Sequence, residues 1–363
     1  MRLVLTGGGT GGHITPALNV ARELMECDSK AELLFIGRQG GKENDAVKKF
    51  GIRLTELEVY GIKRSLSPSN IKTAIADLRA IRKAKDILKE FKPDAVLGTG
   101  GYVCWPVITA AMRMNIPSAI HESNSCPGLV TRLLSKKCSA VLLGYDEARE
   151  HVKGARRIVT VGNPVDKALS RQSRLSARAE LGLRVDEIFI VSFGGSGGAA
   201  VMNSAISELM EHVSSKDARI KHLHATGRAY FEKWNKRSLA GCKVVPYIDD
   251  MPKYLKAADI VISRCGAMAV SELSAVGAPS VLIPSPNVTN DHQRRNARIL
   301  SDRGAAIVLE EAELPYGRLI ETVRELSENR GLRDTLSRKI KALSDTSAAK
   351  NIIGVLKELS GES

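Results

Sequence analysis

Residues 3–13 read LVLTGGGTGGH, in which a short apolar run is followed at once by five glycines and a histidine. Residues 188–199 read IFIVSFGGSGGA and repeat the arrangement. Glycine permits the positive φ angles and the close backbone approach that a tight strand-to-helix turn needs. In α/β folds the helix that opens after such a turn points free N–H groups at an anion or a sugar oxygen. The two stretches predict two nucleotide-binding-type halves, each with its own Gly-rich turn.

Short apolar runs recur along the chain with helix-length segments between them. They are rich in Val, Ile and Leu without strict alternation, which is typical of parallel strands buried on both faces. The expected strands cover residues 3–6, 33–37, 95–98, 117–121, 140–143, 158–162, 188–193, 221–225, 243–245, 259–263, 280–284 and 306–309. This order predicts an α/β fold with two Rossmann-like, doubly wound parallel-sheet domains. We expect the domains to span residues 1–163 and 164–341, and a C-terminal helix in 342–363 to pack back toward the first domain.

Composition excludes several classes of protein. The 363 residues are 43% hydrophobic and 26% charged, which suits two globular domains. No stretch approaches the roughly 20 apolar residues of a membrane-spanning helix, and no secretory signal is visible. The six cysteines form no CxxC pair, so we expect reduced thiols without a disulfide framework or zinc site. No Asp-x-Asp sequence is present, and a metal at a diphosphate is not expected.

The net charge of +14 fits either a solvated basic surface or an anionic partner, which would be a nucleic acid, an anionic lipid or an anionic substrate. Residues 1–165 hold 25 Lys and Arg against 16 Asp and Glu, so the excess is larger in the first half. Only 4% of residues are aromatic and no nucleic-acid module is recognised, which disfavours a nucleic-acid binder.

His13 ends the first Gly-rich turn and is placed where ligands bind in α/β folds. A neutral imidazole near pH 7 suits a general base, although a lone histidine is more often structural. In the second turn, Ser196 offers a hydroxyl to a phosphate oxygen. A third polar cluster, His121-Glu122-Ser123-Asn124, follows an expected strand and fits the rim of a site or a capped turn.

Two further segments carry candidate ligand groups in the second half. Arg264 ends the strand at 259–263, and Glu272 lies about two turns into the helix that follows. A carboxylate there suits the two vicinal hydroxyls of a ribose, although an isolated helical Glu is usually only solvated. Gln293 offers both a donor and an acceptor to sugar hydroxyls, and a polar helix start is the alternative.

Together these residues resemble the MurG family of glycosyltransferases. The resemblance covers nearly the whole chain, in the family's order, through GGGTGGHITPAL, GTGGYVCWP, HESNSCPGL, VGNPV, SFGGSGGA, YIDDM, SRCGAMAVSEL and DHQRRNA. It implies a GT-B fold with an interdomain cleft. It also implies an inverting transfer of N-acetylglucosamine from UDP-N-acetylglucosamine (UDP-GlcNAc) to the C4 hydroxyl of lipid I, giving lipid II. That product serves peptidoglycan synthesis, and with it cell shape and division.

The resemblance also assigns site residues. It names His13 as the leading base, with His121 and Glu122 as runners-up. In this picture Ile248 faces uracil, Glu272 holds the ribose and Ser196 meets the diphosphate. The residues expected to line the UDP-GlcNAc site are Thr10, Gly11, Gly12, Asn124, Ser196, Ile248, Arg264, Ala267, Met268, Ala269, Val270, Ser271, Glu272 and Gln293. The resemblance implies no cofactor and no metal, and positions 123, 166, 197 and 265 depart from the family's common residues.

The basic first half then has a membrane interpretation. Residues 62–92 combine Ile71, Ile75, Leu78 and Ile81 with Lys63, Arg64, Lys72, Arg79, Arg82, Lys83 and Lys85. An interfacial helix on the anionic inner leaflet has this composition, and so does a helix packed on the sheet with a basic outer face. The resemblance implies a peripheral enzyme at the cytoplasmic face of the cell membrane. Alternatives are a glycosyltransferase with a glycolipid product and a nucleotide-sugar-binding protein without catalysis.

Overall fold

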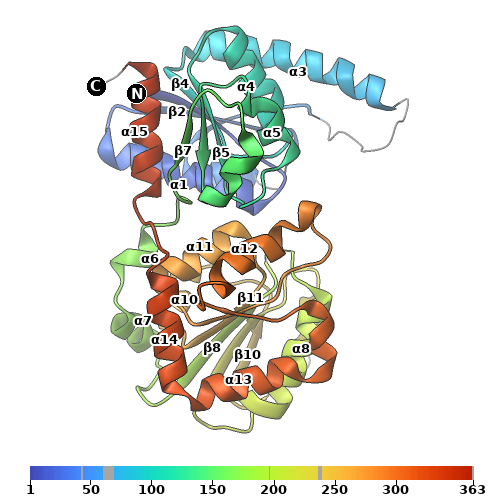
Figure 1. The fold of residues 1–363 in the computed structure, drawn as a ribbon, viewed down its shortest axis with the longest axis vertical. Coiled ribbons are helices and arrows are strands. Elements are labelled where there is room, and N and C mark those ends of the chain that lie inside the picture. The colour runs from blue at the N-terminus through green and yellow to red at the C-terminus, as the bar shows by residue number, and fades with distance from the viewer. Residues whose placement is uncertain (42–43, 60–68, 196, 236–238, 362–363) are drawn as a thin grey trace. The chain divides into compact units, whose positions relative to one another are not determined.

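The structure, a computed structural model, describes all residues except 42–43, 60–68, 196, 236–238 and 362–363, and the side chains of 69–75. The chain divides into two compact units, one of Met1–Val165 with Asp345–Ser363 and one of Asp166–Ser344. The divisions thus fall after residues 165 and 344, where the sequence suggested 163 and 341. Each unit is built on one all-parallel sheet, so the predicted doubly wound α/β architecture is confirmed (Figure 1).

The sheet of the first unit has the strand order β3-β2-β1-β4-β5-β6-β7. Its strands are β1 (Arg2–Thr6), β2 (Glu32–Arg38), β3 (Arg53–Leu57), β4 (Ala95–Gly98), β5 (Ser118–Glu122), β6 (Ala140–Leu143) and β7 (Ile158–Thr160). The chain runs outward from β1 to β3 and then returns to place β4 on the other side of β1. The reversal between β1 and β4 is a topological switch point, where ligands bind at the carboxyl ends of the strands.

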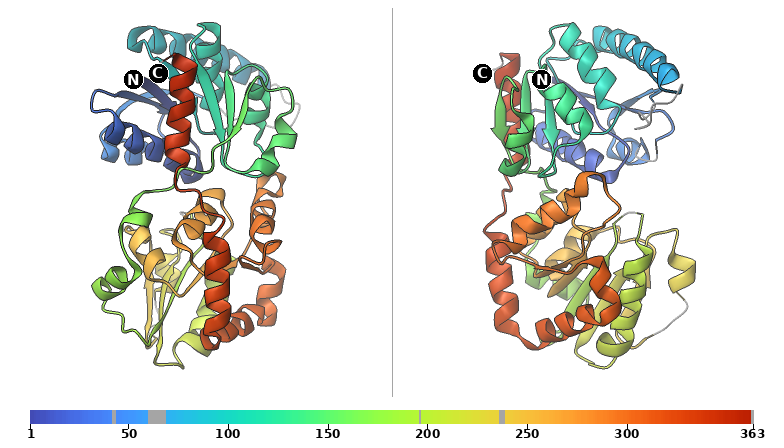
Figure 2. Two further views of the ribbon diagram at one scale, coloured as in Figure 1. Left: turned by 60° about the vertical axis from the view of Figure 1, so that its left-hand side comes forward. Right: turned by 45° about the vertical axis from the view of Figure 1, so that its right-hand side comes forward.

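Helices cover both faces of this sheet. They are α1 (Gly11–Cys27), α2 (Asn44–Phe50), α3 (Ser69–Phe91), α4 (Cys104–Arg113), α5 (Leu129–Ser135) and α15 (Ala348–Ser360), with a 3₁₀ turn at Asp146–Val152. Helices α3, α4 and α5 bury their apolar side chains against one face. Helices α1, α2 and α15 pack on the other, where α15 lies beside α1 (Figure 2). The C-terminal helix therefore belongs to the first unit.

Two details differ from the sequence predictions. Strand β3 was not expected, because RLTEL has no Val or Ile and its edge position leaves most of it half-buried. The last helix begins at Ala348 and not at residue 342, because an Asx turn interrupts the chain before it. The Asp345 carboxylate accepts hydrogen bonds from the Ser347 N–H and hydroxyl, 2.8 and 2.6 Å away.

The sheet of the second unit has the order β10-β9-β8-β11-β12-β13. Its strands are β8 (Ile188–Phe193), β9 (Ile220–Ala225), β10 (Cys242–Val245), β11 (Ile260–Ser263), β12 (Ser280–Leu282) and β13 (Ile307–Val308). Here the chain reverses between β8 and β11. This second switch point is the counterpart of the one between β1 and β4.

The helices of the second unit again lie on both faces. They are α6 (Ala168–Arg171), α7 (Arg174–Glu180), α8 (Ala200–Leu209), α9 (Phe231–Trp234), α10 (Met251–Ala257), α11 (Ala267–Val276), α12 (His292–Ser301), α13 (Arg318–Glu328) and α14 (Arg330–Lys341). A π-helical turn, η2 (Met210–Ser214), extends α8, and 3₁₀ turns lie at Thr289–Asp291 and Glu311–Tyr316. Helices α8 and α13 pack on one face. Helix α10 packs on the other, where the Tyr254 ring lies 6.3 Å from that of Phe189.

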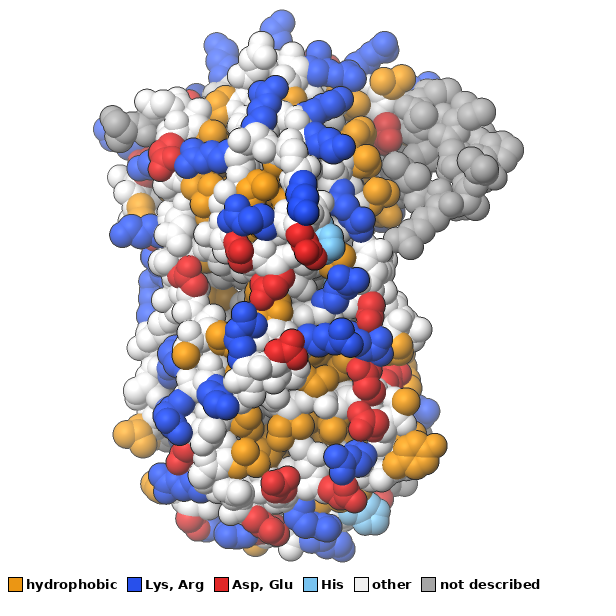
Figure 3. Space-filling model, viewed as in Figure 1, with side chains coloured by type: hydrophobic (Ala, Val, Ile, Leu, Met, Phe, Trp, Pro, Cys, Tyr) orange, Lys and Arg blue, Asp and Glu red, His pale blue; other side chains and the backbone are white. Residues whose placement is uncertain are grey.

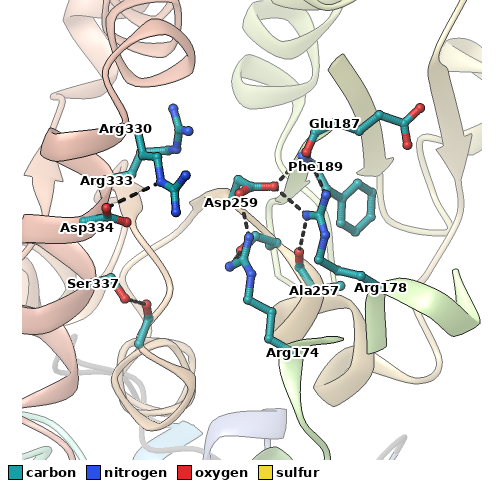
Figure 4. Close-up of polar contacts among 12 residues, drawn as sticks. Arg174, Arg178, Glu187, Phe189, Ala257, Asp259, Arg330, Arg333, Asp334 and Ser337 are labelled. Atoms are coloured by element: carbon teal, nitrogen blue, oxygen red, sulfur yellow. Dashed lines mark hydrogen bonds and ion pairs between the residues drawn. The ribbon is translucent and has the colours of Figure 1, made fainter. Parts of the chain in front are cut away.

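Asp259 fixes the start of β11 beside β8 (Figure 4). Its carboxylate accepts hydrogen bonds from Arg174 at 2.6 Å, from Arg178 at 2.7 Å and from the Phe189 N–H at 2.8 Å. Arg178 is buried and also donates to the carbonyl oxygens of Arg184 and Glu187, so its charge is fully hydrogen-bonded. These hydrogen bonds hold the start of β11 beside β8, and they thereby help to fix the position of the carboxyl end of β11.

Candidate functional site

The first Gly-rich turn joins β1 to α1 at the switch point of the first unit. Gly9 has φ +90°, and the helix begins at Gly11, inside the motif and not after it. The N-cap residue Thr10 makes no side-chain capping hydrogen bond, and the first turn of α1 holds no acidic residue. Thr10, Gly11 and Gly12 are exposed. The first N–H groups of α1 are therefore available to an anion or a sugar oxygen.

His13 lies in the first turn of α1 and is half-buried. Its Nδ1 atom is 3.0 Å from the carbonyl oxygen of Gly8 and 3.4 Å from the Thr10 hydroxyl. A carbonyl oxygen only accepts hydrogen bonds, so Nδ1 of the neutral ring carries the proton. Nε2 is then left with its lone pair, which is the form that a general base needs.

The loop after β4 encloses the same imidazole. A Cβ atom built on Gly100 meets Cδ2 of His13 at 2.5 Å and Nε2 at 2.9 Å, so no larger residue fits beside the ring. The Gly8 N–H donates to the Gly100 carbonyl oxygen at 3.1 Å. The Thr99 hydroxyl donates to the His13 carbonyl oxygen at 2.5 Å. Two sequence motifs, GGGTGGH and GTGGY, are thus joined around His13.

His121 does not lie at a rim, and that prediction is wrong. It sits within β5 with none of its surface exposed. Its Nε2 lies 3.0 Å from the Gly162 carbonyl oxygen, and its Nδ1 lies 3.4 Å from the Ser123 hydroxyl. Burial lowers the pKa of His121, so its ring is neutral and holds the ends of β5 and β7 together.

Glu122 is also buried, and its carboxylate is fully occupied by the loop that follows. One oxygen accepts the N–H and the side-chain amide of Asn124, both at 3.0 Å. The other accepts the Gly128 N–H at 3.0 Å and the Thr131 hydroxyl at 2.8 Å. Four donors leave no free lone pair in a good direction, so this geometry favours a structural role for Glu122. Asn124 remains half-buried at the loop, with its amide turned toward Glu122.

The second Gly-rich turn joins β8 to α8 at the other switch point. Gly195 and Gly198 have φ of +86° and +72°, and α8 begins at Ala200. A Cβ atom on Gly198 collides with the Thr226 carbonyl oxygen, so the turn lies directly on the end of β9. Ser196, the predicted phosphate contact, lies outside the described residues.

Helix α11 begins on the opposite side of that switch point. Its N-cap is Gly266, which has no side chain to cap the first turn, and no acidic residue lies there. Ala267, Met268 and Val270 are buried, whereas Ala269, Ser271 and Glu272 are half-buried. The free N–H groups and the positive end of the helix dipole suit a diphosphate.

Glu272 stands on the half-buried side of α11. No described residue donates a hydrogen bond to its carboxylate. Removal from water, followed by repulsion from Asp166, raises the pKa of Glu272 to about 7. A carboxylate that is costly to ionise alone gains most from donors such as two vicinal ribose hydroxyls.

Arg264 and Gln293 differ in which of their polar groups remain available to a ligand. Arg264 donates to the carbonyl oxygens of Ile283 and Pro284 and pairs with Glu311 at 2.5 Å, so its guanidinium is held by the protein. Gln293 accepts the Ser285 N–H at 2.9 Å and the Cys265 N–H at 3.4 Å through its amide oxygen. The orientation of the Gln293 amide is thereby fixed, and its NH₂ group is the half left for a ligand.

Two residues at the entry to α12, just before Gln293, have left-handed backbone conformations. Asn290 and Asp291, neither of them glycine, have φ of 57° and 51°. Such residues cost of order 1–3 kcal/mol each and persist where their surroundings hold them. Arg294 restrains Asp291 through a hydrogen bond of 2.8 Å. The Arg294 guanidinium is itself held by hydrogen bonds of 2.8 Å to both carboxylate oxygens of Glu310.

Ile248 is buried in the loop between β10 and α10, with only 3% of its surface exposed. Its neighbour Tyr247 is exposed, and the Arg228 guanidinium lies 5.6 Å from the centre of the Tyr247 ring. The contact between Arg228 and Tyr247 was not predicted from the sequence, because nothing in the spacing of residues 228 and 247 links them.

Comparisons with known proteins show the family of the chain. Residues 3–143 match the glycosyltransferase family 28 N-terminal domain, and residues 189–352 match its C-terminal domain. Proteins named UDP-N-acetylglucosamine--N-acetylmuramyl-(pentapeptide) pyrophosphoryl-undecaprenol N-acetylglucosamine transferase are similar over 99% of both chains. The one from Bacillus licheniformis is 41% identical and the one from Bacillus subtilis is 40% identical. The crystal structure of Acinetobacter baumannii MurG has a TM-score of 0.77 at 26% identity, over 98% of this chain and 99% of that one.

Proposed function

The chain belongs to glycosyltransferase family 28, in the group of the N-acetylglucosamine transferases to which it is similar over nearly its full length, and we propose that it catalyses that group's reaction. The donor is UDP-GlcNAc. The acceptor is the N-acetylmuramyl-pentapeptide pyrophosphoryl-undecaprenol known as lipid I, and the product is lipid II of peptidoglycan synthesis. The observation that carries the proposal is the His13 imidazole, whose Nδ1 lies 3.0 Å from the Gly8 carbonyl oxygen at the first switch point, so that in the neutral ring Nε2 holds the lone pair.

His13 acts as the base. Nε2 takes the proton of the acceptor's C4 hydroxyl while that oxygen attacks the anomeric carbon of N-acetylglucosamine. The bond from that carbon to the diphosphate oxygen breaks, and the electron pair leaves with UDP. Attack from the side opposite the leaving group inverts the configuration and gives a β-1,4 linkage. General-base help of this kind contributes roughly 10²–10⁴ in rate.

The donor is held by the second unit. The ionised Glu272 carboxylate accepts the two ribose hydroxyls, and Ile248 packs against the uracil with Tyr247 beside it. The start of α11, from Ala267 to Ser271, and the Gly-rich turn with Ser196 receive the diphosphate. Fixed N–H dipoles stabilise the charge that develops on the leaving UDP without having to reorient during the reaction.

The acceptor side belongs to the first unit, where Thr10, Gly11 and Gly12 present their N–H groups beside His13. Asn124 lies in the neighbouring loop, whose conformation is held by the hydrogen bonds that Glu122 accepts. The Gln293 amide reaches the sugar of the donor, whereas Arg264 supports the loop that carries it. The cleft between the domains that the family implies stays a prediction.

The protein acts as a peripheral enzyme on the inner face of the cell membrane. In the part of the chain that the structure describes, no helix is long and apolar enough to cross a bilayer. Lys and Arg side chains are frequent on the visible face of the first unit (Figure 3). On α3, Arg79, Arg82 and Lys83 are exposed, and Leu78 is 53% exposed. These groups suit an anionic leaflet, to which each cation contributes roughly 1 kcal/mol.

The segment 62–92 is therefore only partly interfacial in the proposal. Ile81 is 5% exposed and packs in the core with Ala84 and Leu88, which fits the second alternative from the sequence, a helix packed on the sheet with a basic outer face. The side chains of Lys63, Arg64, Ile71, Lys72 and Ile75 lie outside the described residues. The described part of α3 is a packed helix with a basic outer face.

Product formation from labelled UDP-GlcNAc tests the proposal, with a short-chain lipid I analogue and a diacylglycerol compared as acceptors. Transfer to the lipid I analogue alone is the expected result. Transfer to diacylglycerol, or hydrolysis of the donor without transfer, contradicts it.

A further inference from the structure

A line of buried polar side chains crosses the interior of the second unit and is not used by the proposed reaction. It starts in the π-helical turn η2 and ends below the second Gly-rich turn. Its members are each no more than 2% exposed, and they are Ser214, His222, Ser192, His224, Asn203 and Thr226. Apolar residues are the usual occupants of such positions, so six polar groups in one line need a reason.

Each member contacts the next at hydrogen-bond distance. The Ser214 hydroxyl lies 2.9 Å from Nδ1 of His222, whose Nε2 lies 2.8 Å from the Ser192 hydroxyl. The same hydroxyl lies 2.9 Å from Nδ1 of His224. Nε2 of His224 lies 3.1 Å from the Asn203 amide oxygen, and the Asn203 NH₂ group donates to the Thr226 carbonyl oxygen at 3.1 Å.

The orientation of the Asn203 amide sets the positions of the protons along the line. The Thr226 carbonyl needs a donor, which turns the Asn203 NH₂ group toward it and the amide oxygen toward His224. Nε2 of the neutral His224 ring then donates to the Asn203 amide oxygen, while Nδ1, which lies 3.2 Å from the Ser192 carbonyl oxygen and 2.9 Å from the Ser192 hydroxyl, accepts the proton of that hydroxyl. That hydroxyl oxygen in turn accepts the Nε2 proton of His222, and Nδ1 of His222 accepts the Ser214 hydroxyl. Both imidazoles are neutral in this arrangement.

Burial supports the neutral state of both rings. Removal from water lowers the pKa of His224 to about 4, and that of His222 is also lowered far below its usual range. At neutral pH the line is therefore ordered in one direction, and Asn203 cannot flip without leaving two acceptors facing each other.

Thr226, the last member of the line, lies against the second Gly-rich turn. A Cβ on Gly198 collides with the Thr226 carbonyl oxygen, and a Cβ on Gly227 collides with the backbone of Gly198. The turn therefore rests on the Thr226–Gly227 peptide with no side chain between them. Any shift of the Thr226 carbonyl moves the surface on which the turn lies.

We propose that His224 is a positioning residue for the diphosphate of the donor: through Asn203 it holds the Thr226 carbonyl and thereby the position of Gly197 and Gly198 in the second Gly-rich turn. The inference rests on the proposed function, in which that turn receives the diphosphate. Uridine binding depends on Glu272 and Ile248, which the line does not touch. The line therefore controls affinity for UDP and not affinity for uridine.

Calorimetric titration of full-length His224→Leu with UDP and with uridine tests this. We expect UDP affinity to fall about tenfold or more and uridine affinity to stay within about twofold of the native value. His224→Gln keeps one acceptor and one donor and should restore most of the UDP affinity, which a purely space-filling role does not predict. Kinetics should show a raised KM for UDP-GlcNAc with an unchanged KM for the acceptor.

If His224→Leu does not fold, Ser192→Ala tests the proposal in its place, because this substitution removes only one small hydroxyl from the middle of the line. Its matched control is Ser327→Ala, because Ser327 is also buried and donates only to the Val323 carbonyl oxygen within α13. Equal loss of UDP and uridine affinity, or no loss of either in a folded variant, overturns the proposal. If the native protein binds neither ligand, the proposed function fails before the role of His224 is at issue.

Discussion

Nδ1 of His13 lies 3.0 Å from the carbonyl oxygen of Gly8, five residues earlier in the same Gly-rich turn. The turn that presents N–H groups to a ligand thus also fixes the tautomer of the histidine beside them. Because Nδ1 donates to a carbonyl, the basic nitrogen is Nε2. Gly100 lies against the same ring, where an added Cβ atom would come within 2.5 Å of Cδ2. The proposed base and the proposed anion site are therefore parts of one backbone structure.

Replacing His13 with Ala should lower kcat by roughly 10²–10⁴, because the acceptor hydroxyl then loses its base. The proposal assigns UDP binding to the second unit, so the affinity for UDP should be unchanged. Single-turnover transfer and UDP titration on the same preparation measure both quantities. Near-native turnover in a folded His13→Ala protein would falsify the assignment of the base.

Gly100→Ala should reduce activity far more than Gly9→Ala. Both glycines have positive φ, +113° and +90°, so either substitution strains the backbone by about 1–2 kcal/mol. Only at Gly100 does the new methyl group meet the imidazole, since nothing lies within 4 Å of a Cβ on Gly9. Turnover and thermal unfolding of the pair separate the two effects. Equal activity losses would show that strain, and not the position of His13, is responsible.

Glu122→Gln should destabilise the protein by about 1–3 kcal/mol while each folded molecule keeps most of its turnover. The amide that replaces one carboxylate oxygen faces either the two donors of Asn124 or those of Gly128 and Thr131. Urea unfolding gives the free energy, and the rate per folded molecule is measured well below the transition. A loss of 10² or more in rate at unchanged stability would return Glu122 to the role of base.

Glu272 links donor binding to pH. Its pKa is raised to about 7 from an ordinary value of 4.5, mainly by burial. Between these values the native state holds a proton that the unfolded state has lost, so this group makes the unfolding free energy fall as pH rises. Glu272→Gln should therefore be more stable than the native protein at pH 8, by about 1–3 kcal/mol, and equally stable near pH 4.

The ribose hydroxyls need the ionised carboxylate, so UDP affinity of the native protein should increase as pH rises through about 7. Binding should also release protons near that pH, which calorimetry in two buffers detects. UDP affinity that is flat from pH 6 to 8, or unchanged in Glu272→Gln, would remove Glu272 from the ribose site.

Charge reversal of Arg79, Arg82 and Lys83 to Glu should abolish flotation with anionic vesicles and leave transfer to a water-soluble acceptor unchanged. Each removed cation loses roughly 1 kcal/mol of attraction to the surface. The matched control reverses Arg330, Arg338 and Lys339, which are equally exposed on α14 of the second unit. Equal losses in both triple variants would mean that net charge alone drives the binding.

Much of this arrangement follows from the sequence. Apolar runs marked twelve of the strands, because β-branched residues buried on both faces leave a clear signal. The Gly-rich turns marked the two switch points, since only glycine tolerates the φ of Gly9 or Gly198. Strand β3 was missed because an edge strand with one buried residue has almost no such signal.

The roles of the polar residues were harder to predict. The sequence places His13, His121 and Glu122 alike near the ends of apolar strands, and only the structure separates the half-buried His13 from the buried His121 and Glu122. Burial depends on what packs over a residue, and here that is the Gly162–Asn163 loop from a distant part of the chain. The line from Ser214 to Thr226 was missed for the same reason, because strand periodicity does not say which buried histidine finds a partner.

The most direct test of the proposed function is donor-selective transfer to a lipid I analogue by the purified protein, with UDP-GlcNAc, UDP-N-acetylgalactosamine and UDP-glucose compared, with and without EDTA. The proposal predicts EDTA-resistant transfer of N-acetylglucosamine alone, in a β-linked product. Preference for another sugar, or UDP release without that product, would contradict it.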